Sequence, residues 1–329
     1  MANLENIQLA NYQTLITQGA VAETQLPGSA VNESVNFHFD SIGAATIRKG
    51  TTLLGTAGVL SGNLLGLYEF RDSGSGSNNQ IIAVNGTVAY YLSGSTWTSK
   101  RTTLTAASKA RFTTFLDYVW MVNGTEATAI WSGATGDSFI TTGNAASAPT
   151  GKYIDNFRAR VWIAGNSTYP DRAYYSSLPS AVTTPIVTWD TNVNTGNWID
   201  VSPSDGENIT GIKRAKQALL VFKNNHLYRI YSVNQTESDP TINVGTYSQE
   251  SIIEAENGFY FHHPKGIYLY NEGVKRISQP IQDFIDGVAL SQYSSVAGWQ
   301  DGDHIYHELG DVTVGGVTYQ NVVSRYTIS

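Results

Sequence analysis

The stretch YVWMVNG, residues 118–124, decides the fold of this chain because a close copy, RVWIAGN, occupies residues 160–166. Each copy is followed by a second strand-like run, ATAIWSG at 127–133 and RAYYSSL at 172–178. Both units therefore predict a β-hairpin with a small, polar tip. Repeated hairpins at such a spacing are typical of folds that are built from many similar sheets.

Weaker copies of the same plan run along most of the chain. The six equivalent points are Val88, Val119, Val161, Leu219, Phe259 and His304. They recur roughly every 43 residues, which is the length of a four-stranded propeller blade. We therefore expect an all-β protein, a six-bladed β-propeller, although five or seven blades also fit the spacing. A pair of β-sandwiches is the alternative architecture.

The two ends of the chain complete this predicted architecture. Residues 33–55 have the pattern of a hairpin, which we expect to close the ring by pairing with the final strand at 322–329. A single propeller domain then covers residues 33–329. Residues 1–32 lack the pattern and predict an extended N-terminal arm, either a disordered tail or a strap on a neighbouring subunit. The one short helix is expected at Pro280–Val288, where a proline precedes apolar residues at helical spacing.

Composition excludes several classes of protein. The chain has 329 residues, 41% of them hydrophobic and only 14% charged, and its net charge is −7. This charge argues against tight binding to a phosphate backbone. The absence of cysteine excludes disulfides, thiolate metal sites and cysteine nucleophiles. The sequence contains neither a secretory signal nor an apolar run long enough for a membrane span.

Histidine pairs are the first place to look for a metal site. His262 and His263 are adjacent, and His304 and His307 are three residues apart. In a strand, both spacings direct the two side chains to opposite faces, so neither pair can chelate one metal ion. We predict that all four are structural polar residues at blade edges, and we expect no metal and no cofactor.

Carboxylates and sequence motifs point to no catalytic site. Asp205 and Glu207 flank a turn with Asp200 nearby, and Asp301 and Asp303 flank another turn; local turn chemistry explains both groups. The chain has no Gly-x-Ser-x-Gly elbow, phosphate loop or His-Glu-x-x-His. A paired-carboxylate glycosidase remains open as an alternative.

Aromatic residues divide into strand and loop positions. Trp120, Trp131 and Trp162 lie in predicted strands, where packing between sheets explains them. The tryptophans of predicted loops are candidates for a subunit surface, as is a proline of the arm. These four candidate interface residues are Trp97, Trp189, Trp198 and Pro27.

Two stretches resemble proteins of one family. Residues 36–55, NFHFDSIGAATIRKGTTLLG, resemble the opening of the propeller proteins of short-tailed bacteriophages. Residues 243–286 resemble a block of the same proteins that has a Gly-aromatic run, Gly-Ile-Tyr, and then Ile-Ser-x-Pro-Ile before a short helix. Variants of this block occur in tail hub, nozzle and head-completion proteins.

The resemblance implies a structural virion protein without catalysis. Its copies would form a ring, a hexamer, in the head-to-tail connector or tail tube, between the portal or adaptor and the other tail proteins. Genomic DNA would pass through the ring without specific binding. The expected location is the virion tail, after assembly in the host cytoplasm, with no membrane partner. The alternatives are a carbohydrate-binding or glycoside-hydrolysing β-propeller, and a bacterial surface or scaffold propeller.

Overall fold

The structure is a computed structural model that describes residues 53–72, 79–181, 186–233, 243–271 and 273–328, the backbone of 235–238, and four short strands ahead of residue 53. Contacts divide the chain into two units, Met1–Leu54 and Gly55–Ser329. The first unit holds two small sheets. They are a parallel pair of β1 (Thr14–Leu15) and β2 (Ala30–Val31), and an antiparallel pair of β3 (Phe37–Phe39) and β4 (Ala45–Ile47).

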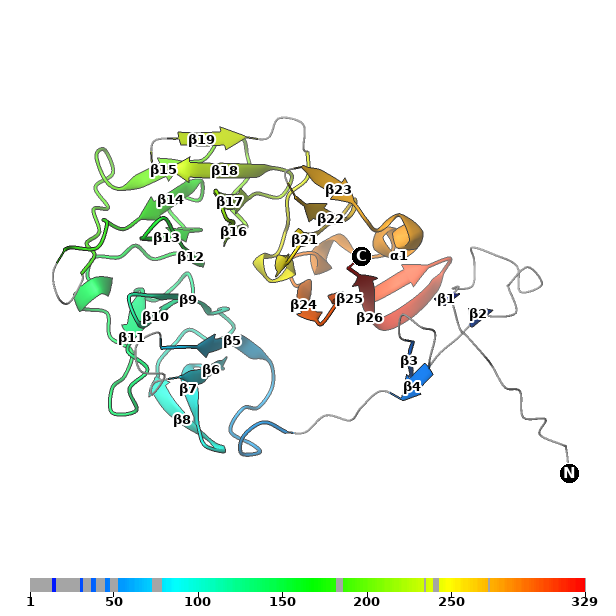
Figure 1. The fold of residues 1–329 in the computed structure, drawn as a ribbon, viewed down its shortest axis with the longest axis horizontal. Coiled ribbons are helices and arrows are strands. Elements are labelled where there is room, and N and C mark those ends of the chain that lie inside the picture. The colour runs from blue at the N-terminus through cyan, green and yellow to red at the C-terminus, as the bar shows by residue number, and fades with distance from the viewer. Residues whose placement is uncertain are drawn as a thin grey trace, which may run out of the picture. The chain divides into compact units, whose positions relative to one another are not determined.

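The second unit consists of six antiparallel sheets of three or four strands, each made from strands that are consecutive in the chain (Figure 1). The first sheet is β5 (Leu64–Phe70), β6 (Gln80–Asn85), β7 (Val88–Ser93) and β8 (Thr96–Arg101). The second is β9 (Arg111–Phe115), β10 (Tyr118–Val122) and β11 (Ala129–Trp131). The third is β12 (Tyr153–Phe157), β13 (Arg160–Ala164), β14 (Arg172–Tyr175) and β15 (Trp198–Asp200).

The other three sheets follow the same meander. The fourth is β16 (Gly211–Arg214), β17 (Leu219–Phe222), β18 (Leu227–Ser232) and β19 (Gln235–Ser238). The fifth is β20 (Ile253–Ala255), β21 (Gly258–His263), β22 (Gly266–Tyr270) and β23 (Val274–Arg276). The sixth is β24 (Ala297–Asp301), β25 (His304–Val314) and β26 (Val317–Thr327).

Helical structure in the described residues is short and lies between these strands. The single α-helix is α1 (Gln282–Asp286), and the 3₁₀ turns are η2 (Gly143–Ala145), η3 (Gln249–Ser251), η4 (Gln279–Ile281) and η5 (Leu290–Gln292). The helix predicted at Pro280–Val288 is confirmed by η4 and α1. Its first turn carries Pro280 at a position where the missing N–H costs nothing.

The two strong sequence copies adopt the same local structure. In each, a two-residue turn with positive φ, Leu116–Asp117 or Arg158–Ala159, joins the first strand of a sheet to the second. The indole N–H of Trp120 donates to the carbonyl of Phe115 at 3.2 Å. The equivalent Trp162 donates to Phe157 at the same distance. The repeat detected in the sequence is therefore a structural repeat.

Val88, the first of the six equivalent points, lies on a different strand of its sheet from the other five. Val119, Val161, Leu219, Phe259 and His304 lie on the second strand of their sheets, but Val88 begins the third strand, β7. The second strand of that sheet is β6 (Gln80–Asn85). Both strands are apolar and alternate similarly, so the pattern alone did not distinguish them.

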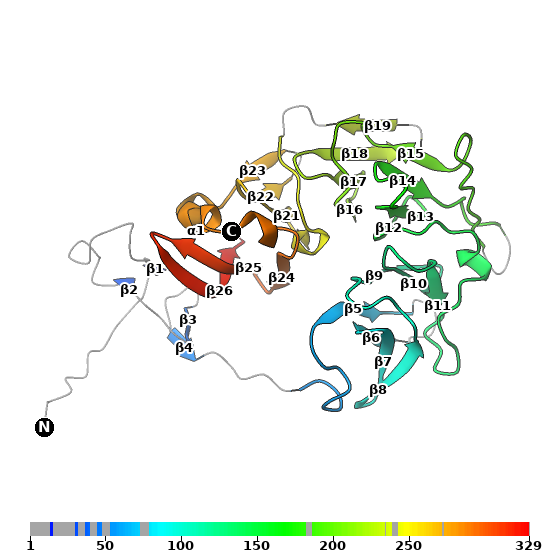
Figure 2. The ribbon, with the colours of Figure 1, turned by 180° about the vertical axis from the view of Figure 1, so that it is seen from behind.

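The sheets pack face to face around a common centre (Figures 1 and 2). Hydrophobic clusters lie at each of the five junctions between successive sheets. At the junction of the third and fourth sheets, for example, Trp162 packs with Leu219 and Ile230. A small sheet cannot bury enough apolar surface alone, so each one depends on its neighbours. The described residues therefore form an all-β, propeller-like fold.

Most of the residues to which the predictions for the chain ends apply fall outside the described residues. The arm at residues 1–32 and its Pro27 fall outside the described residues, apart from the backbone of β1 and β2. A hairpin within residues 33–55 is present as β3 and β4. Its predicted pairing with the last strand stays a prediction. The return strand at 322–329 is part of β26, which pairs with β25 over a longer hairpin than expected.

Candidate functional site: the central cavity

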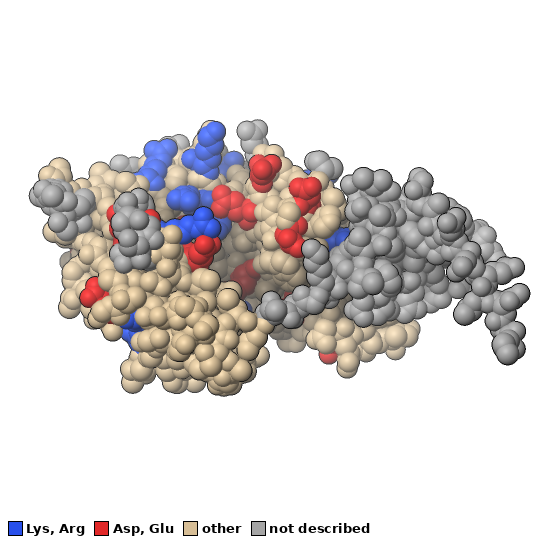
Figure 3. All heavy atoms as spheres, turned by 60° about the horizontal axis from the view of Figure 1, so that its bottom comes forward, with Lys and Arg blue, Asp and Glu red and all other residues tan. Residues whose placement is uncertain are grey.

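The first strands of successive sheets border a central cavity. Its volume is about 1050 Å³, and Figure 3 shows the hollow with charged side chains around it. Residues of β5, β9, β12 and β16 line it, together with η3 and the neighbourhood of β24. The charged residues of the lining are Lys109, Arg111, Asp155, Lys213, Arg214, Glu250 and Glu308.

Hydrogen bonds along the cavity wall link neighbouring sheets. The Asn156 side-chain amide on β12 donates to Thr113 Oγ1 at 3.0 Å and to the Thr114 carbonyl at 2.9 Å, both on β9. The guanidinium of Arg214 on β16 donates to Asn156 Oδ1 at 2.7 Å. On the other side, the hydroxyls of Tyr68 on β5 and Thr114 are 2.8 Å apart. Polar side chains thus connect four successive sheets around the cavity.

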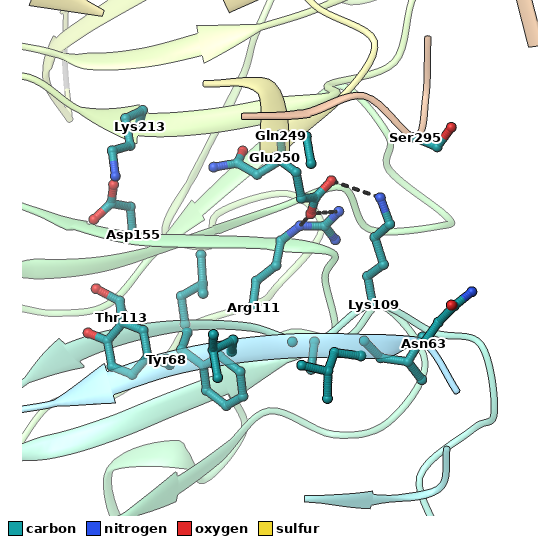
Figure 4. Close-up of a pocket in the computed structure, with 18 of the residues that line it drawn as sticks. Asn63, Tyr68, Lys109, Arg111, Thr113, Asp155, Lys213, Gln249, Glu250 and Ser295 are labelled. Atoms are coloured by element: carbon teal, nitrogen blue, oxygen red, sulfur yellow. Dashed lines mark hydrogen bonds and ion pairs between the residues drawn. The ribbon is translucent and has the colours of Figure 1, made fainter. Parts of the chain in front are cut away.

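Glu250 reaches from η3 to the cations at the start of the second sheet (Figure 4). Its carboxylate lies 3.1 Å from Lys109 Nζ and 2.6 Å from Arg111. Burial raises the pKa of the Glu250 carboxyl, but Arg111 and Lys109 outweigh burial, so the pKa lies below its usual value. A second cavity of about 310 Å³ shares Lys109, Arg111, Gln249 and Glu250 with the first. The ion-pair cluster therefore lies between the two cavities.

We expect Glu250→Gln to lower the free energy of unfolding by about 2 kcal/mol, because two cations lose their partly buried partner. This expected loss is smaller than for a fully buried ion pair, because Glu250 and Lys109 are partly exposed to solvent. Urea unfolding at pH 7 measures it. Glu254→Gln is the control, since Glu254 is more exposed and lies 3.8 Å from Lys213. If both variants lower the free energy of unfolding equally, the ion pairs of Glu250 with Lys109 and Arg111 do not stabilise the fold.

Of the four candidate interface residues, Trp97 and Trp198 lie in strands, Trp189 lies in a loop, and Pro27 falls outside the described residues. Trp97 lies within β8 and is only 6% exposed. Trp189 is 8% exposed, and its ring centroid is 6.1 Å from that of Trp120. Trp198, half-buried on β15, lies over the guanidinium of Arg172 at 3.4 Å from ring centroid to Cζ. The side chains of Trp97 and Trp189 are therefore buried, and neither is exposed on the surface of this chain. Their contact with a partner stays untested.

A buried lysine is the feature that sequence reasoning missed. Lys223, directly after β17, is 0% exposed. Its ammonium donates to Asp171 Oδ1 at 2.8 Å, to Asp205 Oδ1 at 2.8 Å and to the Ser202 carbonyl at 3.1 Å. The acceptors precede Lys223 by 18 to 52 residues, so no local motif could have revealed them. Asp205 does accept from the Glu207 amide as turn chemistry predicts, but its main partner is the lysine.

Other acidic residues near this turn are also engaged. Asp200 accepts from Arg172 Nε at 2.7 Å and from its terminal nitrogen at 3.1 Å. Glu207 lies 2.9 Å from His226 Nδ1 and also accepts from Asn225. These carboxylates bind neighbouring cations and amides of the same fold, which gives them a structural role.

The histidines are more deeply buried than predicted. His262 and His263 lie on β21, and His307 lies on β25, all within the packed interior rather than at sheet edges. The opposite orientation predicted for the adjacent pair is confirmed, since His262 stacks on Tyr293 while His263 Nε2 lies 3.2 Å from Asn225 Oδ1. Among the described residues, no cluster of three or more His, Asp or Glu side chains has the arrangement of a metal site.

Comparison with known proteins identifies no family for this chain. No protein-family model matches the chain, and no curated protein sequence does. Among solved structures, BBS1N in complex with ARL6DN is 9% identical, covers 81% of this chain and 79% of its own, and has a TM-score of 0.48. An extracellular domain from B. thetaiotaomicron is 13% identical over 81% of this chain, with a TM-score of 0.39. This chain spans 39% of the length of that bacterial chain. In the described part of this chain, no helix is both long and apolar enough to cross a membrane.

Proposed function

We propose that this chain is a structural subunit of the head-to-tail connector or tail tube of a short-tailed bacteriophage, and that its copies assemble into a ring. The observation that carries the proposal is the resemblance of residues 243–286 to a block of such proteins. These residues fold into one unit here, η3, the sheet β20–β23, η4 and α1. The proposed neighbours are the portal or adaptor and the other tail proteins.

The chemistry of the cavity supports a structural role. Glu250, Asn156 and Arg214 all form hydrogen bonds or ion pairs with other residues of the wall. Side chains whose polar atoms already form hydrogen bonds or ion pairs between sheets are poor candidates for proton transfer or substrate binding. A wall of this kind fits a subunit whose task is to keep its shape within an assembly.

DNA would pass between copies of the chain and not through one copy. The grooves of B-DNA are about 8.5 Å and 7.5 Å deep, so a duplex is wider than roughly 16 Å. The central cavity of about 1050 Å³ would hold about 5 Å of such a cylinder, less than two base pairs. The conduit in this proposal is therefore the axis of the ring, with the net charge of −7 favouring release of DNA.

The six sheets of the second unit are the six blades in this proposal. Each follows the up-and-down order of a propeller blade, and the two three-stranded sheets are incomplete blades. Among the described residues, the hydrophobic clusters join successive sheets, and none joins the first sheet to the sixth. Closure of the ring of blades is thus part of the proposal.

Assembly with tail partners tests the proposed function. The full chain is expected to form rings of about six copies with portal or adaptor protein, as the resemblance implies; a ring is one of the closed assemblies that symmetric oligomers form. Light scattering measures the mass, and negative-stain imaging shows the ring. A particle that stays monomeric and binds none of these partners would overturn the proposal.

Deleting residues 2–30 is expected to weaken ring assembly while leaving the fold of the second unit intact. The reason is that a strap acts through the contacts that it makes with a neighbouring subunit. Circular dichroism and urea unfolding check the fold, and light scattering of the truncated chain checks assembly. Rings of unchanged stability would mean that the arm is not a strap.

A carbohydrate-binding propeller is the second candidate. The observation that favours it is the stacked pair Tyr68 and Phe112 on the cavity wall, with ring centroids 5.5 Å apart and planes at 21°. Apolar rings beside polar groups are typical of small-molecule sites. A glycan array and a reducing-sugar assay test this candidate. It is excluded if the protein binds no glycan and releases no reducing sugar.

A further inference from the structure

The junction between the fifth and sixth sheets contains an unusual concentration of buried imidazoles. His262 on β21 is 2% exposed, and neither ring nitrogen has a hydrogen-bond partner among the residues that the structure describes. Its ring stacks on Tyr293 at 5.2 Å and lies 6.1 Å from the ring of His307 on β25. A buried imidazole without a partner tolerates the neutral form far better than the cation.

Ser251 connects the two histidines through its backbone and hydroxyl. His307 Nε2 lies 3.0 Å from the Ser251 carbonyl, to which it donates as the neutral Nε2–H tautomer. The hydroxyl of the same serine accepts from the His262 backbone amide at 3.4 Å. His307 is also completely enclosed, at 1% exposure. The two rings are thus fixed across the seam between β21 and β25.

The charges that act on this pair offer no compensation for a proton. Those acting on His262 come from His307 and His263, which are both cations once protonated. Glu207 acts on His263, where Lys265 opposes it, and Asp286 acts on Tyr293. Thr246 and Ser251, which form hydrogen bonds with the pair, are uncharged, and Arg325, which lines the cavity beside His307, is a further cation. A proton on either ring would therefore be buried next to the other ring without a counter-ion.

The interface between the fifth and sixth sheets, the seam, contains unfilled space. A cavity of about 110 Å³ lies beside His307, lined by isoleucines of both sheets and by η4. Beyond the histidines, the seam is held by two apolar clusters, one with Ile253, Tyr260 and Ile305 and the other around Ile285. Separation of β24–β26 would expose both clusters but would leave the junctions of the first five sheets intact.

We infer that the seam between β20–β23 and β24–β26 is an acid-sensitive latch, which opens when His262 and His307 take up protons and the last sheet separates from the fifth. Burial lowers the pKa of His307 to about 4 and that of His262 well below its usual value. Imidazoles in the open state regain a pKa of about 6.5. Between these values the open state binds more protons, so the latch weakens as the pH falls below about 6.5.

The size of the effect follows from the linkage. The pKa of His307 is about 4 in the closed state and about 6.5 in the open state. The equilibrium constant for opening therefore rises about 20-fold between pH 7 and pH 5. His262, whose pKa is also lowered by burial, adds a further increase in the same direction. Hydrogen exchange of the full chain, corrected for the intrinsic effect of pH, measures opening of β24–β26 separately from the first five sheets.

Two variants and a control test the latch. His262→Phe keeps the stack on Tyr293 but removes both unpartnered nitrogens, so we expect the pH sensitivity of opening to fall to the roughly 20-fold that His307 alone supplies. His262→Phe with His307→Gln is expected to remove the sensitivity while glutamine still donates to Ser251. His226→Gln is the control, because His226 is partly exposed beside Glu207. Wild-type sensitivity in the double variant, or acid opening that begins in the first five sheets, would overturn the inference.

Discussion

Lys223→Met is expected to lower the free energy of unfolding by about 3–5 kcal/mol at pH 7, the cost of removing one member of a buried ion-pair cluster. The methionine would fill the space but leave Asp171 and Asp205 facing each other without the ammonium that now holds both. Lys216→Met is the control, because Lys216 is exposed on a turn. Urea unfolding measures both losses.

The pH dependence of that loss identifies its cause. In the native protein, burial raises the pKa of Asp205, but Lys223 and the Glu207 amide outweigh burial, and the pKa is lowered. Its contribution is therefore present above the unfolded pKa of about 3.9 and is lost as the pH falls through the lower folded value. Without the lysine, protonation relieves the carboxylates, so the deficit of the variant should shrink at low pH. A deficit independent of pH would point to packing alone. If Lys223→Met does not fold, Asp205→Asn offers a milder version of the same test.

Trp120→Ala is expected to lower the free energy of unfolding by about 3–5 kcal/mol, the usual cost of truncating a buried aromatic residue. Trp120 is 0% exposed at the junction of the second and third sheets, where Val161 and Trp189 belong to the same cluster. The cavity would also loosen Trp189, which lies nearly seventy residues away in sequence. Urea unfolding measures the loss, and intrinsic fluorescence follows the surroundings of Trp189.

Trp299→Ala is the matched control for this prediction. Trp299 is 44% exposed and stacks on Tyr306 within its own sheet. Its loss should stay below about 1.5 kcal/mol, since part of its surface already faces water. A comparable cost for Trp120 and Trp299 would contradict the view that packing between sheets stabilises this fold.

Much of the fold was predictable because it is repeated. The hairpins at Tyr118–Trp131 and Arg160–Tyr175 have local signals, alternating apolar residues and turn residues, that need no distant partner. The helix after Pro280 has a local signal as well. The error at Val88 shows the limit, since two neighbouring apolar strands present the same pattern and only pairing tells them apart.

The central cavity was much less predictable. Glu250 and its partners Lys109 and Arg111 are about 140 residues apart, and no spacing rule links them. The loop tryptophans were candidates for a subunit surface on local grounds, but burial of Trp189 depends on Trp120 in another sheet. Turn chemistry explained part of the role of Asp205 and missed Lys223, because hydrogen bonds within a turn are local and ion pairs between sheets are not.

The sequence by itself determined the all-β class, the repeated hairpins and the single helical segment, because strand alternation, turns and helix starts depend on residues a few positions apart. Tertiary structure alone decided which side chains meet. It buried Trp97, Lys223 and His262, placed Glu250 against two cations and brought two histidines together at one seam. Burial and electrostatic partners depend on how the sheets stack, and stacking joins residues that no local pattern connects.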